Sequence, residues 1–597
     1  MKESLQVAKL KSRMALLERD SIAYGAPITL EGWIEPDDSR EERSALRLSQ
    51  GCVWCGERRR FELAGRFAAA PRAGRLPALI LRLGRSASLE KLAFLYGPEA
   101  LVEIDDEIVF GMDPNHDVWE LPARFADGQP HRLRLVGWTG IRQEPYQVGF
   151  IGSGSIASDA RKLYLLSQLC METAELSADD TLRARLLDCL DAAFLRINWS
   201  DSPGGISDES VTATMDELKA RLAELPRAPL WSAVACGHGH LDLAWLWQTQ
   251  TAKGKATRTV SNVLRLMELD PEFRFSQTQA QLYAWIEERY PALFRRVFGR
   301  VQSGQWEILG GMWVEPDCNI TGGESLVRQM LLYHSYMRDA FGVCGSPVVW
   351  LPDTFGFCAQ LPQLMKSAGL KYFATAKLSW NETNKMPAET FRWCGLDGSE
   401  VLAHIVSTSK PAWWGATYSA DLSAAELCAT VQSLAQKHGT DSFLVAYGMG
   451  DGGGGPTEDM VRRGALLERV GVPGLPGVRR GTFESFFTQL KNTHQLPVWQ
   501  GELYFELHRG TYTGQAETKR LNQRCESALH QAEFLAAWAA DAAGAPYPHQ
   551  KFRNAWQTVC LNQFHDILPG SSIHAVYQDA AIQCEAVLKT CETIVSD

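Results

Sequence analysis

Between residues 230 and 480, short apolar runs alternate with amphipathic segments of ten to twenty residues. Helical periodicity predicts helices over 280–299, 324–341 and 458–469, and the apolar runs between such segments are typical of buried strands. Strands and helices that alternate in this way form a parallel sheet covered by helices. Ligands of such folds gather at the carboxyl ends of the strands, so polar residues at those ends are the first candidates for a functional site.

One predicted strand end carries a histidine and a carboxylate. The apolar run 230–236 is followed by His240 and Asp242, which are two residues apart. If the extended geometry persists through them, both side chains face one point, because alternate residues of a strand share a face. An imidazole and a carboxylate that converge can form half of a zinc or other transition-metal site. The alternative is a pair of polar residues that cap the following helix.

Two distant segments are candidates for the remaining ligands. Residues 348–351 form another apolar run, which is followed by Asp353 within the sequence Asp-Thr-Phe-Gly. His565 and Asp566 lie between two helical patterns near the end of the chain. A metal site completed in this way would combine three segments that lie far apart in the sequence.

These motifs resemble those of the α-mannosidases of glycoside hydrolase family 38, most closely the cytosolic or vacuolar type. Further blocks that look like the family occur in the same order, at residues 310–317, 376–381, 450–455 and 506–512. In the family a zinc-type ion is held by four side chains, and the matching positions here are His240, Asp242, Asp353 and His565. The resemblance therefore implies Zn²⁺, or Co²⁺ in its place, as the cofactor.

The resemblance also implies catalytic roles for two aspartates. Asp353 matches the family's nucleophile, and family members are retaining enzymes, so a covalent mannosyl-aspartate is implied. Asp451 is our candidate for the general acid, because the glycines around it allow a bulky substrate to approach closely. A helix cap is the alternative for Asp353, and a turn residue is the alternative for Asp451. A phosphate-binding loop is disfavoured because no Lys-Ser/Thr pair follows the glycines.

Five further residues are candidates for contacts with a sugar. Trp245 resembles the family's aromatic platform beneath the sugar, with a core position as its alternative. Asp566 is expected to accept hydrogen bonds from sugar hydroxyls. Trp313, Arg509 and Tyr512 are weaker candidates, since each could instead support the site from behind. The expected substrates are α-mannosides or oligosaccharides with terminal α-mannosyl residues.

The periodicities predict a multidomain α/β protein. Short alternating stretches between residues 28 and 150 predict an N-terminal β-sandwich-like domain. Together with a predicted helix at 5–20, this domain covers residues 1–157. Three helical patterns form a connector at 158–228, the catalytic domain covers 229–498, and a C-terminal helical bundle covers 499–597. The family resemblance implies that the central domain is a seven-stranded α/β barrel.

Composition excludes several classes of partner and compartment. The net charge is −10 with both signs interspersed, so nucleic acid is a poor candidate partner. We find no apolar run of about 18 residues and no apolar signal segment near Met1, which predicts a cytoplasmic protein without a membrane partner. The fourteen cysteines are scattered, as free thiols in a reducing compartment are. Cys52 and Cys55 form an isolated C-x-x-C, for which two structural residues are favoured over a zinc or redox pair.

Two other functions are compatible with the same motifs. A metal-dependent carbohydrate deacetylase also uses Asp and His at barrel strand ends, but its metal activates water and no glycosyl-enzyme forms. A carbohydrate-binding protein could keep the motifs without turnover.

The last predicted helix, at 572–595, has an apolar stripe, and the sequence ends just after it at Asp597. Members of the family continue from the helical bundle into large β-rich domains. We therefore expect either that this chain self-associates or that a C-terminal β domain is missing from it, because an uncovered stripe would leave several hundred Å² of apolar surface in water.

Overall fold

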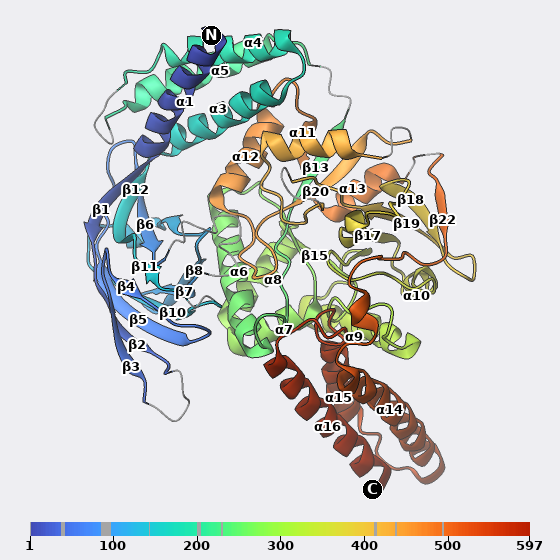
Figure 1. Cartoon of the computed structure of the whole chain (residues 1–597). Helices are drawn as coiled ribbons and strands as arrows, with labels where there is room; N and C mark the ends of the chain where they lie inside the picture. The colour runs from blue at the N-terminus through green and yellow to red at the C-terminus, as the bar shows by residue number, and fades with distance from the viewer. Residues whose placement is uncertain are drawn as a thin grey trace.

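The computed structural model describes residues 2–36, 42–84, 97–141, 144–199, 205–227, 231–410, 415–435, 439–491, 493 and 495–596. Figure 1 shows an N-terminal region of β-sheets, a central region of strands and helices, and long helices that project from it near the C-terminus. This arrangement agrees with the expected multidomain α/β class.

Two antiparallel sheets make up most of the N-terminal region. One has six strands in the order β3-β2-β5-β10-β7-β8, and the other has four in the order β1-β12-β6-β9. Leu63 and Leu135 of the larger sheet and Leu79 and Ile151 of the smaller one belong to the same buried core. The strands are β1 (Ile22–Pro27), β2 (Leu30–Ile34), β3 (Ser44–Leu48), β5 (Arg60–Phe67), β6 (Leu76–Arg82), β7 (Glu99–Ile104), β8 (Glu107–Met112), β9 (Val118–Glu120), β10 (His131–Trp138) and β12 (Phe150–Ile156), with β4 (Val53–Trp54) and β11 (Tyr146–Gln147) paired separately.

Four helices from the first 223 residues pack against one another. Helix α1 (Lys2–Ser21) contacts α3 (Ser158–Leu176) and α4 (Asp180–Phe194), and α5 (Asp208–Ala223) packs on both α3 and α4. Ser207 accepts a hydrogen bond from the backbone N–H of Ser210 and so caps α5. The first helix thus packs against the connector helices, and the domain boundaries stay a prediction.

Two sheets form the central region. In the first, β15 (Trp306–Ile308), β14 (Phe275–Gln277), β13 (Ser232–Gly237) and β20 (Ser442–Tyr447) are parallel, and β21 (Gly477–Arg480) also pairs with β13. The second has the order β16 (Val348–Trp350), β17 (Tyr372–Thr375), β19 (Glu400–Ile405), β18 (Thr390–Cys394), β22 (Val498–Gln500). Backbone hydrogen bonds from Ser346 to Ile308 (2.8 Å) and from Gly310 to Val348 (3.1 Å) join β15 to β16. The predicted parallel strands are therefore present and adjacent.

The predicted single helix at 280–299 is wrong. Helix α7 (Ala280–Arg289) ends before Tyr290, and α8 (Pro291–Gln302) begins directly after it. Proline lacks a backbone N–H and disfavours helical geometry in the residue before it, so Pro291 begins a new helix. The other helices of this region are α6 (Thr249–Leu269), α9 (Gly323–Phe341), α10 (Leu361–Ser367), α11 (Ala424–Ser433), α12 (Glu458–Arg469) and α13 (Phe483–Leu490), with short 3-10 helices at η2 (Ala123–Phe125), η3 (Lys377–Trp380) and η4 (Arg509–Tyr512).

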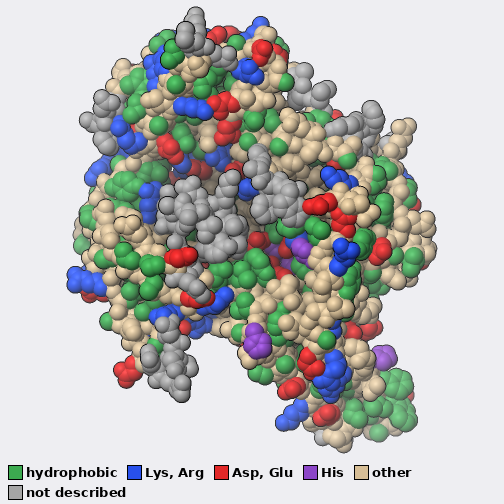
Figure 2. Space-filling view, viewed as in Figure 1, with side chains coloured by type: hydrophobic (Ala, Val, Ile, Leu, Met, Phe, Trp, Pro, Cys, Tyr) green, Lys and Arg blue, Asp and Glu red, His purple; other side chains and the backbone are tan. Residues whose placement is uncertain are grey.

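The last three helices, α14 (Ala516–Ala543), α15 (His549–Asn562) and α16 (His574–Ser596), pack against one another. Much of the apolar stripe of α16 is covered within this group of helices, because Val576, Cys584 and Val587 are buried in the same core as Leu529 of α14. Other apolar side chains of these helices remain exposed, and Figure 2 shows a hydrophobic area over the end of the helices. They include Phe534, Trp538 and Ile582. Self-association of the chain stays a prediction.

Two structural findings concern the cysteines and the length of the apolar helices. All fourteen cysteines lie within the described residues and are free thiols, and Cys52 and Cys55 are among them. None of the helices that the structure describes is long and apolar enough to cross a membrane.

Candidate metal centre and active site

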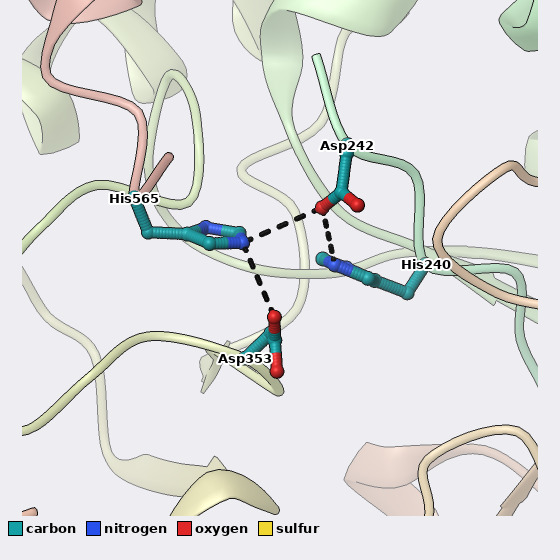
Figure 3. Close-up of side chains that lie close together, drawn as sticks. All are labelled: His240, Asp242, Asp353 and His565. Carbon is teal, nitrogen blue, oxygen red and sulfur yellow. Dashed lines mark hydrogen bonds and ion pairs between the residues drawn. The ribbon is translucent and has the colours of Figure 1, made fainter. Parts of the chain in front are cut away.

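Two histidines and two aspartates from three distant segments converge on one point (Figure 3). His240 and Asp242 follow β13, Asp353 follows β16, and His565 lies between α15 and α16. One nitrogen or oxygen atom from each lies within 4.8 Å of the corresponding atom of every other. All four side chains are buried, and Asp353, at 9% exposed, is the most accessible. The structure thus brings together the four residues that the sequence proposed as metal ligands.

The distances within this cluster suit a divalent cation. Nε2 of His240 lies 3.0 Å from Oδ1 of Asp242, and Nε2 of His565 lies 3.5 Å from the same oxygen and 3.8 Å from Oδ2 of Asp353. Nε2 of His565 is buried without a hydrogen-bond partner. A cation would accept that nitrogen's lone pair and offset the two carboxylate charges. Two imidazoles and two carboxylates form a ligand set that zinc accepts, so the residues fit a metal site.

Glu315 contacts the far side of both imidazoles. Its Oε2 lies 3.0 Å from Nδ1 of His240, and its backbone carbonyl oxygen lies 2.9 Å from Nδ1 of His565. Thr278 donates a hydrogen bond of 2.5 Å to Oε1 of the same carboxylate. A proton held on each Nδ1 leaves each Nε2 free to ligate a metal. Sequence reasoning missed this residue, although it lies in the block 310–317 that the family resemblance included.

The charges of the cluster shift the pKa values of its members. Burial lowers the pKa of His240, but the charges of Glu315 and Asp242 outweigh it and raise the pKa well above its usual value. Burial likewise opposes the rise in the pKa of His565, which the neighbouring aspartates bring to about 9. The pKa of Asp242 falls to about 2 despite burial, because both histidines stabilise its charge. A protonated imidazole cannot ligate a metal through the protonated nitrogen, so metal binding at this cluster competes with proton binding.

Lys377 binds the carboxylate of Asp353. Its Nζ lies 2.6 Å from Oδ1 of Asp353, while Oδ2 is the oxygen that faces His565. The ammonium group also lies 3.8 Å from the ring centroid of Trp380. Lys377 is buried in η3, directly after β17. This contact restricts the orientation of the Asp353 carboxylate, and nothing in local periodicity points to it.

Asp451 lies in the glycine-rich segment after β20. Tyr418 donates a hydrogen bond of 2.8 Å to its Oδ1, and its backbone carbonyl accepts one of 2.9 Å from the N–H of Asp242. Burial, followed by the charges of Asp242 and Asp353, raises the pKa of Asp451 to about 6. A carboxyl group with this pKa carries a proton at mildly acidic pH, as a general acid must.

The predicted sugar-binding residues differ in how they are placed. Asp566 is buried and accepts a hydrogen bond from Ser571, and burial, with the charge of Asp242 next, raises its pKa to about 7. Trp245 is half-buried, and its ring lies edge-on to that of Trp247 with centroids 6.0 Å apart. Neither placement tests contact with a sugar, so the predicted roles of Asp566 and Trp245 remain predictions.

Trp313 has a different environment. It is 2% exposed, and its indole N–H donates a hydrogen bond of 3.1 Å to Gln281. This environment is typical of a core side chain, which was the alternative role, and a contact between Trp313 and a sugar stays a prediction.

Arg509 and Tyr512 lie in the exposed helix η4, and their contribution to substrate binding stays a prediction. The preceding residue, His508, contacts two aromatic side chains near Lys377. Its ring packs edge-on against Phe355 at 5.0 Å and against Trp380 at 6.2 Å. Aromatic side chains therefore gather beside Lys377, which binds Asp353.

Comparison with known proteins identifies the family. Residues 230–502 match the domain described as "Glycosyl hydrolases family 38 N-terminal domain", and residues 506–597 match "Alpha mannosidase middle domain". The chain belongs to glycoside hydrolase family 38. Its family 38 N-terminal domain contains His240, Asp242, Asp353 and Asp451, and the middle domain contributes His565.

Several curated relatives are similar over this part of the chain. Alpha-mannosidase G of Dictyostelium discoideum is 41% identical over 363 residues, and Alpha-mannosidase 2C1 of Homo sapiens is 40% identical over 364. Alpha-mannosidase of Saccharomyces cerevisiae is 39% identical over 378 residues. Each match covers 61% of this chain but only 32% to 34% of the relative, so the chain spans about a third of their length.

One solved structure has a comparable fold. The crystal structure of an alpha-mannosidase from Enterococcus faecalis V583 aligns with a TM-score of 0.53 at 22% sequence identity. The alignment covers 61% of this chain and 42% of that one.

Proposed function

We propose that this chain forms the catalytic part of a zinc-dependent retaining α-mannosidase that hydrolyses terminal α-mannosyl residues of oligosaccharides. The observation that carries the proposal is the buried cluster of His240, Asp242, Asp353 and His565, in which Nε2 of His565 has no hydrogen-bond partner. The α-mannosidase names of the relatives support the choice of sugar.

In this proposal the metal is held by His240, Asp242, Asp353 and His565, and Co²⁺ could replace Zn²⁺. A bound divalent ion supplies positive charge beside the two carboxylates and can ligate sugar hydroxyls. Glu315 orients both imidazoles, and Lys377 orients the nucleophile.

The reaction proceeds in two displacements. A carboxylate oxygen of Asp353 forms a bond to the anomeric carbon while the glycosidic C–O bond breaks and Asp451 gives its proton to the leaving oxygen. Water then attacks the anomeric carbon of the mannosyl-aspartate, Asp451 takes a proton from that water, and Asp353 leaves as a carboxylate. Trp245 and Asp566 are the residues we propose to contact the mannosyl ring.

We also propose that β13, β14, β15, β16, β17, β19 and β20 form one seven-stranded barrel within residues 229–498, with a helical bundle at 499–597. The backbone hydrogen bonds that join β15 to β16 support this arrangement. The free cysteines support a reducing, cytoplasmic setting.

The proposal is tested by incubating the zinc-loaded protein with aryl α-mannosides and following the anomers of the product by NMR. Release of α-mannose as the first product supports it. Initial release of β-mannose would overturn the retaining mechanism. Release of acetate from N-acetylated sugars without glycoside cleavage would favour a deacetylase, and mannose binding without hydrolysis would favour a binding protein.

A further inference from the structure

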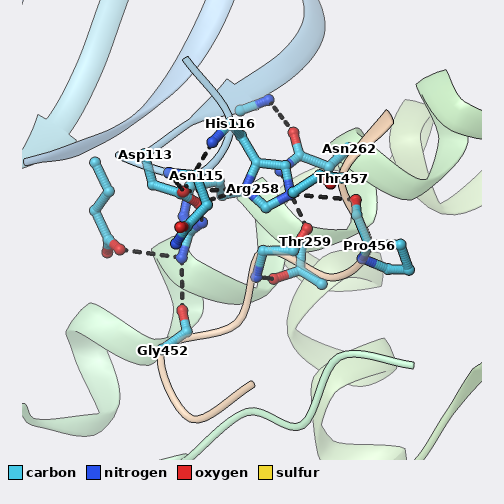
Figure 4. A network of polar contacts seen from close by, with 12 residues as sticks. Asp113, Asn115, His116, Arg258, Thr259, Asn262, Gly452, Pro456 and Thr457 are labelled. Atoms are coloured by element: carbon cyan, nitrogen blue, oxygen red, sulfur yellow. Dashed lines mark hydrogen bonds and ion pairs between the residues drawn. The ribbon is translucent and has the colours of Figure 1, made fainter. Parts of the chain in front are cut away.

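Three side chains of α6 contact the segment that follows Asp451 (Figure 4). Arg258 donates a hydrogen bond of 2.5 Å to the carbonyl oxygen of Gly452. Asn262 donates one of 3.2 Å to the carbonyl oxygen of Gly454, whose N–H donates one of 2.8 Å to the hydroxyl of Thr259. The backbone directly after Asp451 is therefore bound to one face of α6.

The N-terminal β region binds the same side chains from the other side. Asp113, just after β8, pairs with Nη1 of Arg258, and Glu99 at the start of β7 lies 3.0 Å from Nη2. The N–H of Gly111 donates a hydrogen bond of 2.6 Å to the side-chain oxygen of Asn262. Arg258 and Asn262 thus each connect the N-terminal region to the segment that carries Asp451.

A third connection joins the N-terminal region to the segment after Asp451 without a side chain of α6 between them. Nε2 of His116 lies 3.2 Å from the carbonyl oxygen of Pro456, and its Nδ1 lies 2.9 Å from Oδ2 of Asp113. A Cβ atom on Gly454 would lie 2.9 to 3.0 Å from atoms of His116, Arg258 and Asp113. The glycine is therefore packed against this network, and no larger residue fits at its position.

The network is buried, so its charged side chains depend on one another for stabilisation. Asp113, His116, Arg258 and Asn262 are each no more than 3% exposed. Burial would raise the pKa of Asp113, but the charges of His116 and Arg258 outweigh it and lower the pKa. Loss of the Asp113 charge would leave Arg258 with less compensation in a low-dielectric environment, and a buried charge without its partner is costly.

Asp451 itself has a backbone that needs such support. Its φ is 53°, in the left-handed region that residues other than glycine rarely adopt. On its other side, Leu241 and Gly452 form an antiparallel bridge. The segment 450–455 is therefore held between the metal-site segment and α6.

From these contacts we infer that Asp113, Arg258 and Asn262 are positioning residues for Asp451, so that the N-terminal β region holds the general acid in place. The inference rests on the proposed role of Asp451. It predicts that disruption of the network reduces proton donation by Asp451 more than it reduces nucleophilic attack by Asp353 or metal binding.

The test compares Asp113→Asn with Asp117→Asn. Asp117 is a matched control, because it is also buried and pairs with Arg82 within the β region. For each variant, kcat/KM is measured on dinitrophenyl α-mannoside, whose leaving group needs no proton, and on an α-mannobiose, whose leaving group does. Asp113→Asn should lose at least about tenfold more activity on the mannobiose than on the aryl substrate, while Asp117→Asn should keep the wild-type ratio.

Hydrogen exchange gives a readout that does not depend on turnover. Peptides spanning residues 448–457 should exchange faster in Asp113→Asn than in the wild type or in Asp117→Asn. Asn262→Ala, which removes both the Gly111 and Gly454 contacts, should show the same two effects if Asp113→Asn does not fold.

Equal losses on both substrates together with unchanged exchange would overturn the inference. If the wild type hydrolyses neither substrate, or if Asp451→Ala is equally impaired on both, the proposed function or the acid role fails. In that case faster exchange in Asp113→Asn still supports the structural part of the inference, and unchanged exchange overturns it.

Discussion

The carboxylate of Glu315 lies 3.0 Å from Nδ1 of His240, on the opposite side of the imidazole from Asp242. The backbone carbonyl of the same residue lies 2.9 Å from Nδ1 of His565. One residue therefore sets the orientation of both histidines in the cluster, and a metal bound there would depend on it.

Glu315→Ala should weaken metal binding by about 10–100-fold, the usual effect of losing a partner that orients a ligand. The reason is that His240 loses its carboxylate partner, although His565 keeps the backbone carbonyl. Metal titration of the apo-protein measures the effect. Glu426→Ala removes another buried carboxyl group, on α11, and should leave metal affinity unchanged. Equal affinity in both variants would show that Glu315 does not orient the ligand.

Lys377→Met should lower kcat by about 10²-fold, because the Asp353 carboxylate loses the ammonium group that orients it. Metal content should stay near that of the wild type, since Lys377 binds Oδ1 of Asp353, whereas Oδ2 is the oxygen that faces the cluster. Steady-state kinetics and elemental analysis measure the two quantities. Loss of the metal together with the activity would mean that Lys377 supports the cluster rather than the nucleophile.

Asp451→Ala should spare substrates with good leaving groups and lose about 10²–10⁴-fold on those with poor ones. A leaving group of low pKa departs without a proton, whereas a sugar hydroxyl does not. A series of aryl α-mannosides of graded leaving-group pKa measures this dependence. A uniform loss across the series would remove Asp451 from the acid role.

Trp313→Phe should lower the melting temperature and leave KM unchanged, because the indole fills the core and bonds to Gln281. Thermal unfolding and KM for an aryl mannoside, measured on one preparation, check both points. A raised KM with unchanged stability would support Trp313 as a sugar contact.

Part of the site could be predicted from local sequence. His240, Asp242 and Asp353 follow apolar runs that are recognisable as buried strands, and parallel strands bring such residues to one edge. His565 has no such signal, since it lies in a connection between helices. Only the family resemblance assigned it to the cluster.

Other features could not be predicted because they depend on tertiary contacts. Lys377 and Glu315 act on residues that are distant in sequence, and no periodic pattern marks them. The pair of Asp113 and Arg258 joins positions 145 residues apart. The sequence pattern of α16 shows an apolar stripe but not what covers it, because α14 begins more than fifty residues earlier. By contrast, the break at Pro291 was readable from the sequence, since proline disfavours helical geometry in the preceding residue.

Chelation should abolish hydrolysis, and added Zn²⁺ or Co²⁺ should restore it, because without the ion no divalent charge offsets the carboxylates of Asp242 and Asp353 in the buried cluster. The metal-free protein should also melt at a lower temperature, since a ligand that binds only the native state stabilises it. Full activity in a sample verified to be metal-free would contradict the metal site.

In the proposed reaction, Asp353 forms a covalent bond to the anomeric carbon of mannose. The direct measurement is mass spectrometry of peptides from the zinc-loaded protein after incubation with a fluorinated mannosyl fluoride, which slows hydrolysis of the glycosyl-enzyme. We expect a fluoromannosyl adduct on the peptide that contains Asp353, and no adduct in Asp353→Ala. An adduct on a different carboxylate, or rapid turnover of aryl mannosides with no adduct at all, would contradict it.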